Sequence, residues 1–313
     1  MASIITILRM PPLTSSTAYI AVLAAGDNFA LITKLVLHQL TKHDVIGVWG
    51  CRLLYYLGSF SIMYVNWILV AMTVERFIAI WFPLKVVNYC NWKNACYAMT
   101  GVAVVLLLAN LQFLWSQTQS SDGKGDIHCK FQTEYETFIY LYWYWIDGAL
   151  YAIVPCILLF VFNFLIIFGI RKSTRIQEGL IHNKSRHTTE TMKQQRQITI
   201  MLVVVSVVFV LLILPNCLFF IIKAYWIYTP NSYEHVIFLL TEQLIFVLAD
   251  SNHAVNFYLY FLSGKKFRKR FFDTIFCRHI ARRTSTEFKR SSNNDSTGTS
   301  NSFSPLHRHQ TSF

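Results

Sequence analysis

Residues 67–85 of this 313-residue chain read WILVAMTVERFIAIWFPLK. An apolar run that ends in the pair Glu75-Arg76 is typical of a helix that crosses a membrane and meets the polar interface at that point. Such a pair could by itself be no more than an interfacial ion pair. The whole string is much more specific than the pair, because apolar and aromatic residues continue on both sides of it.

Composition favours lipid as the solvent of this chain. Hydrophobic residues make up 54% of it and charged residues only 14%, whereas soluble domains carry about a quarter charged residues. The net charge of +12 comes from Lys and Arg between long apolar runs, where charge sets membrane orientation, so nucleic acid is not an expected partner. The 7 cysteines include no CxxC pair and no Cys/His spacing suited to zinc.

Six segments are long and apolar enough to span the hydrocarbon core, which takes about 20 residues. None alternates as a barrel strand does, and a helix satisfies its own backbone groups in lipid. We therefore expect an all-α membrane bundle, whose fourth span is long enough to project beyond the bilayer. The predicted spans are 17–38, 52–82, 96–116, 138–170, 198–225 and 236–262.

Lys and Arg predict the orientation of these spans. If Arg9 is cytoplasmic, then 82–95, 171–197 and everything after 263 are cytoplasmic, and with Arg76 that side holds 22 of the 28 Lys and Arg. An asymmetry of this size sets topology and, with six spans, places both termini in the cytoplasm.

The chain divides into a bundle at 1–262, an amphipathic cytoplasmic helix at 263–277 and a disordered Ser/Thr-rich tail at 278–313. Cys277 lies where palmitoylation is plausible, and an unmodified thiol explains it equally well. Basic Ser/Thr clusters in the tail would suit phosphorylation and arrestin, and Thr311-Ser312-Phe313 fits a PDZ ligand.

The string at 67–85 resembles the rhodopsin-like (class A) G-protein-coupled receptors, whose third span ends in Asp/Glu-Arg-Tyr/Phe. The resemblance implies that Arg76 is a switch cation, paired with Glu75 at rest and released toward a G protein on activation. Asn256 and Tyr260 look like the ends of the seventh-span Asn-Pro-x-x-Tyr motif and complete this switch.

The resemblance also implies an activation core and an extracellular disulfide. Pro155 and Pro215 match the kinks of the family's fifth and sixth spans, and Phe209 matches the sixth-span aromatic that moves on activation. Asn66 belongs to the same core, at a position where the family usually has an apolar residue. Cys51 and Cys129 match the cysteines of the family's disulfide.

A buried polar core follows from physics as well as from the resemblance. Asp27 lies in the middle of the first predicted span, and Asn252, His253 and Asn256 crowd the last one. An aspartate at a helix centre costs roughly 2.5–3.5 kcal/mol on insertion scales, so these groups should turn inward. In the family this carboxylate binds sodium, and no other cofactor is expected, although a purely structural polar network is also possible. His253 is expected to be a hydrogen-bonded core residue rather than a metal ligand.

The family's first span is expected to be missing. Only the apolar stretch 3–8 precedes the first predicted span, and it is far too short to cross a membrane. Asp27 would then lack its usual asparagine partner and turn to Asn252, Asn256 or water. The chain as written is accordingly expected not to signal alone.

The ligand class depends chiefly on Gly58, which stands where amine receptors carry an aspartate. The chain looks most like FMRFamide-type neuropeptide receptors, and the acids of its expected pocket favour a ligand that carries a cation. Ordinary helix packing is the alternative for each aromatic residue taken singly. The expected pocket residues are Arg52, Tyr55, Asp147, Tyr151, Phe220, Glu242, Phe246 and Asp250.

We therefore expect a multi-pass plasma-membrane receptor, not an enzyme, that binds an extracellular peptide and activates a heterotrimeric G protein. One alternative is a truncated, non-signalling receptor that modulates full-length receptors by association. Another is a transporter, for which internal repeats would be expected, and the sequence shows none.

Overall fold

The computed structural model describes residues 15–43, 45–121, 127–178, 186–226, 229 and 232–263. The predictions for the short apolar stretch 3–8, for the amphipathic helix after Ser263, for Cys277 and for the tail with Thr311–Phe313 lie outside these residues.

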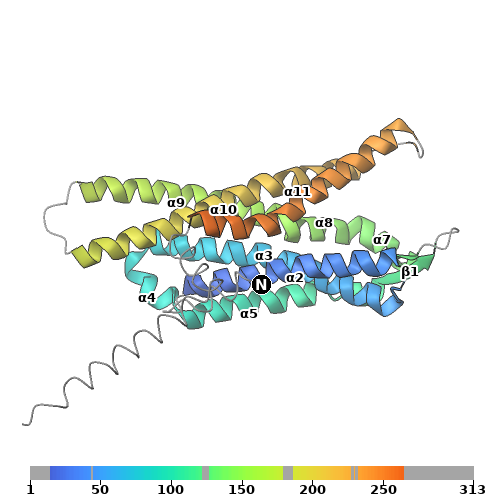
Figure 1. Ribbon diagram of the computed structural model, residues 1–313, viewed down its shortest axis with the longest axis horizontal. Coiled ribbons are helices and arrows are strands. Elements are labelled where there is room, and N and C mark those ends of the chain that lie inside the picture. The colour runs from blue at the N-terminus through green and yellow to red at the C-terminus, as the bar shows by residue number, and fades with distance from the viewer. Residues whose placement is uncertain are drawn as a thin grey trace, which may run out of the picture.

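Long helices run alongside one another along the long axis of the molecule (Figure 1). The described helices with enough length and apolar character to cross a membrane are Ser15–Lys42, Val48–Trp81, Trp92–Ser116, Thr133–Lys172 and Thr199–Lys223. The last helix, α11 (Tyr233–Ser263), has 31 residues and packs against α10 and α2. The prediction of a helical membrane bundle is therefore confirmed, and the chain is a multi-pass membrane protein.

The helices occupy the predicted segments with shifted ends. The bounds of the first group are α2 (Ser15–Lys42), α3 (Val48–Trp81), η1 (Pro83–Lys85), α4 (Val86–Tyr89), α5 (Trp92–Asn110) and α6 (Phe113–Ser116). Helix α3 ends at Trp81 because Pro83 disfavours helical backbone at the residue before it. Helix α5 begins after Asn91, whose side chain accepts a hydrogen bond from the Asn94 N–H.

The fourth predicted span is longer and less regular than expected. Its pieces are η2 (Thr133–Tyr135), α7 (Glu136–Phe138), η3 (Ile139–Trp143), α8 (Tyr144–Gly148), η4 (Ala149–Ile153) and α9 (Val154–Glu178). The last of these pieces continues to Glu178, eight residues past the predicted end of the span. The segments η3 and η4 are π-helical, which the apolar run did not reveal. Helix α10 (Arg186–Tyr225) likewise begins well before the predicted start.

One short sheet interrupts the helical architecture. Strand β1 (Gln117–Ser121) pairs antiparallel with β2 (Ile127–Phe131), with Gln119 opposite Cys129. This hairpin was not predicted, because its polar sequence lacks the apolar alternation of a half-buried strand.

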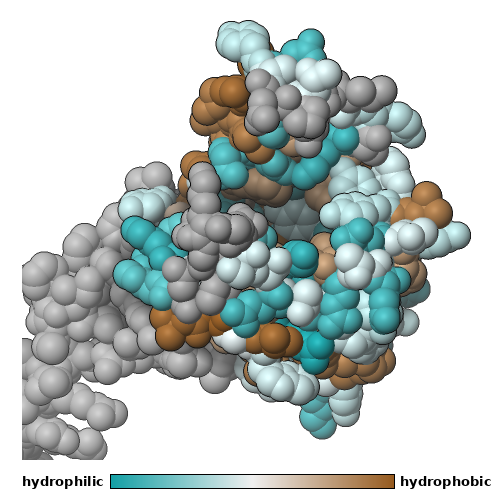
Figure 2. All heavy atoms as spheres, turned by 90° about the vertical axis from the view of Figure 1, so that its right-hand side faces the viewer, coloured by the Kyte–Doolittle hydropathy of each residue, from teal (hydrophilic) through white to brown (hydrophobic). Residues whose placement is uncertain are grey.

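Helix α3 lies at the centre of the bundle and packs against α2, α5, α9 and α10. Leu69, Met72 and Phe209 are among the apolar side chains buried in this core. The paired helices α10 and α11 diverge from the other helices toward the end where β1 lies (Figure 1). Figure 2 looks onto that end and shows a hollow between the α10–α11 lobe and the rest of the molecule.

Candidate functional site

The end of α3 opposite the hollow carries a buried ion pair. Arg76 Nη2 lies 2.7 Å from Glu75 Oε1, and both side chains are buried. The Ser15 hydroxyl of α2 donates to Glu75 over 2.8 Å, and Arg76 donates to the Ser16 hydroxyl. The predicted pairing of Arg76 with Glu75 is confirmed, while the two serines were missed because they lie about sixty residues earlier.

Cys90, in the connection that follows α4, lies beside this pair. Its Sγ donates to the Glu75 carbonyl over 3.7 Å. Burial, assisted by the Glu75 charge, raises the pKa of the Cys90 thiol. The thiol therefore stays protonated at neutral pH and adds no charge to the ion pair.

A second polar cluster occupies the middle of the bundle. Asp27 is 4% exposed, and its Oδ1 lies 2.8 Å from His253 Nδ1. Asn256 Nδ2 donates to Asp27 Oδ2 over 2.9 Å. The predicted contact with Asn256 and the core role of His253 are confirmed. Asn252 is buried in the same helix, and its Nδ2 has no hydrogen-bond partner among the described residues, so of the two asparagines considered as partners of Asp27 it is Asn256 that makes the contact.

Two side chains of α3 satisfy carbonyls that the irregular helix around Pro155 leaves free. Val154 donates its N–H to Ala149 in the π-helical pattern, so it cannot donate to Leu150. Pro155 has no N–H for Tyr151. Trp67 Nε1 donates to the Leu150 carbonyl over 2.9 Å.

Asn66 Nδ2 donates to the second of these carbonyls, that of Tyr151, over 2.7 Å. The structure therefore joins two predicted activation-core residues, Asn66 and Pro155, through a carbonyl that the proline frees. Phe209 is buried in the same core, and Pro215 lies inside α10. The fourth switch residue, Tyr260, lies in α11, and its side chain is outside the described residues.

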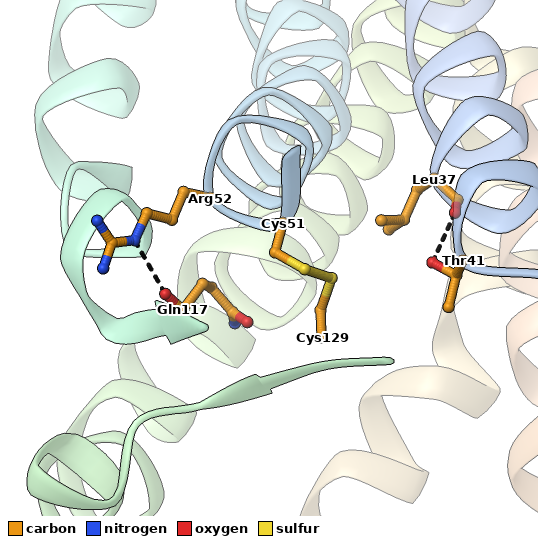
Figure 3. The surroundings of a disulfide bond; sticks show 6 residues. All are labelled: Leu37, Thr41, Cys51, Arg52, Gln117 and Cys129. Atoms are coloured by element: carbon orange, nitrogen blue, oxygen red, sulfur yellow. Dashed lines mark hydrogen bonds between the residues drawn. A yellow bond between two sulfur atoms is a disulfide. The ribbon is translucent and has the colours of Figure 1, made fainter. Parts of the chain in front are cut away.

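The β1–β2 hairpin is tied to the first turn of α3 (Figure 3). Cys51 and Cys129 form a disulfide with a Cα–Cα distance of 5.6 Å, which confirms the predicted pairing. The neighbouring Arg52 donates from Nε to the Gln117 carbonyl of β1 over 3.0 Å, and its guanidinium lies over the Trp49 ring. Arg52 therefore holds the hairpin in place.

Of the five cysteines expected to be free, four are described and are free: Cys90, Cys96, Cys156 and Cys217. The fifth, Cys277, lies outside the described residues.

The three predicted pocket acids differ in their partners. Asp250 of α11 forms an ion pair with Lys34 of α2, and both side chains are 36% exposed. Glu242 forms an ion pair with Lys223. No described residue pairs with Asp147 by a salt bridge or hydrogen bond. Lys34 and Lys223 were not foreseen as partners, because nothing in the linear pattern links them to acids so distant in sequence.

Tyr151 lies in η4, about one turn after Asp147 of α8, and its carbonyl accepts the hydrogen bond from Asn66. The remaining predicted pocket residues divide between two aromatic clusters and an exposed position. Tyr55 lies 6.4 Å from Phe113 between ring centroids, and Phe220 stacks at 4.5 Å on Tyr144. Phe246 is exposed on α11.

The whole bundle matches a known family. The family described as "7 transmembrane receptor (rhodopsin family)" matches residues 3–260. The FMRFamide receptor of Drosophila melanogaster is 25% identical over 295 residues, which cover 88% of this chain and 51% of that receptor. The thyrotropin-releasing hormone receptor of Bos taurus is 26% identical, over 82% of this chain and 69% of its own length. Somatostatin receptor type 1 of Rattus norvegicus is 23% identical, over 84% and 64%. The chain thus spans about half to two thirds of the length of these receptors.

Proposed function

Since the chain belongs to the rhodopsin family of seven-transmembrane receptors, we propose that it is a plasma-membrane receptor that binds an extracellular peptide and activates a heterotrimeric G protein. The observation that carries this proposal is the buried Glu75–Arg76 pair with its serine partners from α2. A buried ion pair is held in place because separating it leaves unpaired charge at a cost of about 3–5 kcal/mol. Such a pair has two distinct states, closed within the receptor or opened onto a partner that supplies another acceptor.

The two ends of the molecule are linked by groups that a ligand can perturb. Lys34 and Asp250 join α2 to α11, and Asp27 joins the same two helices about two turns earlier in α2. A ligand that moves α11 would therefore act on α2, whose Ser15 and Ser16 hold the Glu75–Arg76 pair.

Charge on the predicted pocket acids supports a cationic peptide as the ligand. Lys34 neutralises Asp250, and Lys223 neutralises Glu242. Asp147 is left as the predicted pocket acid without a charge partner in the described part of the chain. A desolvated carboxylate attracts a guanidinium or an amine strongly, because the local dielectric is low. Three relatives bear the names of peptide receptors, in agreement with a peptide ligand.

A sodium ion at Asp27 would require His253 to move away. In the observed arrangement both carboxylate oxygens already contact nitrogen atoms, one from His253 and one from Asn256. We therefore place sodium, if it binds, in a state in which His253 has left the carboxylate. Arrestin on a phosphorylated tail, a PDZ protein at Thr311–Phe313 and lipid around the bundle complete the proposed partners.

The alternatives receive less support. The family match over residues 3–260 favours neither a transporter nor a non-signalling truncated receptor.

Because the chain as written is expected not to signal alone, coupling is tested with G-protein activation in cells that express the chain with and without a grafted first span, using FMRFamide and thyrotropin-releasing hormone as trial agonists. Arg76→Gln should abolish activation while surface level is maintained, because the switch cation is gone. Arg171→Gln, which removes an exposed arginine from α9, is the matched control. Normal activation by Arg76→Gln, or equal loss in both variants, would contradict the proposal.

The ligand class is tested separately with FMRFamide and its analogue in which citrulline replaces the arginine. Asp147→Asn should weaken binding of the arginine peptide about 10-fold or more, the scale of one charged hydrogen bond, and leave the citrulline peptide unaffected. Glu242→Gln serves as the control for an acid that is already paired. Equal binding of both peptides to wild-type receptor would show that no cation is recognised.

A further inference from the structure

Two free thiols meet between α9 and α10, in the core of the bundle. Cys156 Sγ and Cys217 Sγ lie 3.8 Å apart. Their residues are 8% and 7% exposed, and neither forms a disulfide. Cys156 directly follows Pro155, and Cys217 lies two residues after Pro215, so the contact joins the two proline-bearing helices beside their prolines.

The sulfur–sulfur distance suits two ligands of one metal ion. Zinc binds thiolate at about 2.3 Å in tetrahedral geometry, which places two bound sulfurs about 3.8 Å apart. A disulfide would instead require the sulfurs to approach to about 2.05 Å. The observed separation therefore needs little rearrangement for a bridging ion and a larger one for a disulfide.

Charge balance also favours a divalent ion here. When both thiols release their protons to water and bind one dication, the two negative charges cancel the two positive ones. Burial of a net charge in an apolar core is very costly, and this complex carries none. Soft thiolate ligands select ions of the zinc and cadmium type rather than magnesium or calcium.

We propose that Cys156 and Cys217 form a two-thiolate site for a divalent thiophilic cation such as zinc. No third Cys, His, Asp or Glu joins them in the described part of the chain, so water is the expected ligand at the remaining positions. The bound ion fixes α10 to α9 beside Pro155 and Pro215 and stabilises that arrangement of the two helices.

The test uses the full chain in detergent without any peptide, so its outcome is independent of the receptor proposal. Cadmium is the probe, because its thiolate complexes absorb in the ultraviolet. Cys90, Cys96 and Cys277 are first changed to Ser to remove the other unpaired thiols. Cadmium should then produce a thiolate-to-metal absorption band at one ion per chain, protect two thiols from alkylation and raise the thermal unfolding temperature.

Two variants decide whether the pair is the site. Cys156→Ser and Cys217→Ala should each weaken cadmium binding at least about 100-fold. Losing a residue that only supports a metal ligand weakens binding up to about 100-fold, and losing a ligand itself should cost no less. Each variant is checked for a normal unfolding temperature without metal, so that a folding defect is recognised. A band that persists in either variant would overturn the proposal, as would the absence of a band in the parent. Isolation of the parent with the two thiols already joined as a disulfide would also overturn it.

Discussion

The hydrogen bond from Asn66 to Tyr151 can be tested against the proline that makes it necessary. The Tyr151 carbonyl lacks a helical donor because Pro155 has no N–H, and Asn66 Nδ2 donates to it over 2.7 Å. Asn66→Leu removes this donor. Pro155→Ala introduces a backbone N–H that can serve the same carbonyl, so Asn66 should matter less in that background.

The expected magnitude follows from what each change leaves unpaired. A buried carbonyl without a donor costs about 1–3 kcal/mol in proteins generally. Interhelical side-chain hydrogen bonds in membranes average about 0.6 kcal/mol, with a maximum near 1.7. Asn66 Oδ1 is itself buried without a hydrogen-bond partner among the described residues, so its removal offsets part of the loss. The stabilisation gained by removing the unpaired Asn66 Oδ1 is the same in the wild-type and the Pro155→Ala chains, so it cancels in a double-mutant cycle. We therefore expect a coupling of about 1 kcal/mol.

The assay measures thermal unfolding of wild type, Asn66→Leu, Pro155→Ala and the double variant in one detergent. The double variant should be more stable than the sum of the two single effects predicts. Trp67→Phe gives a matched control, because its lost bond goes to Leu150. Additive effects within about 0.3 kcal/mol would show that the proline does not create the need for Asn66.

Three further predictions concern other parts of the bundle. Removing the disulfide by Cys51→Ala and Cys129→Ala should lower stability by about 4.5 kcal/mol in the chain-entropy model, given the 78-residue separation; unchanged thermal stability would contradict this. His253→Leu should cost about 3 kcal/mol, because buried Asp27 loses one of its partners; if adding Asp27→Asn recovers none of the loss, the pairing is unimportant. A glycosylation acceptor inserted between β1 and β2 should be glycosylated in cells while Asn183 is not, and the reverse pattern would invert the topology.

The sequence was sufficient for features that depend on local composition. The six apolar segments predicted helices because each was long enough to cross a membrane, and the described helices occupy them. The resemblance carried by residues 67–85 also led to Cys51 and Cys129, which the structure joins.

Features that depend on distant partners or on backbone detail were not predictable in this way. Lys34 and Asp250 are 216 residues apart, and only the packing of α2 on α11 brings them together. The π-helical segment η4 changes which backbone carbonyls lack a helical donor. An apolar sequence does not indicate whether a helix is α-helical or π-helical, so this change could not be predicted. The sequence left Asn252, Asn256 and water open as partners of Asp27, and only the packing of α11 on α2 shows that His253 and Asn256 contact the carboxylate.

Helix α2 holds its partners along a single line. Ser16 accepts a hydrogen bond from Arg76. Asp27 contacts His253 and Asn256. Lys34 forms an ion pair with Asp250. At 3.6 residues per turn these three positions lie within about 20° of one another around the helix axis, and they span about 27 Å along it. A small rotation of α2 about its own axis would therefore carry all three groups off their partners together. A shift confined to one end could not do so without bending the helix. Rotation of this one helix would thus convert three separate contacts, at both ends of the molecule and in its middle, into one all-or-none step.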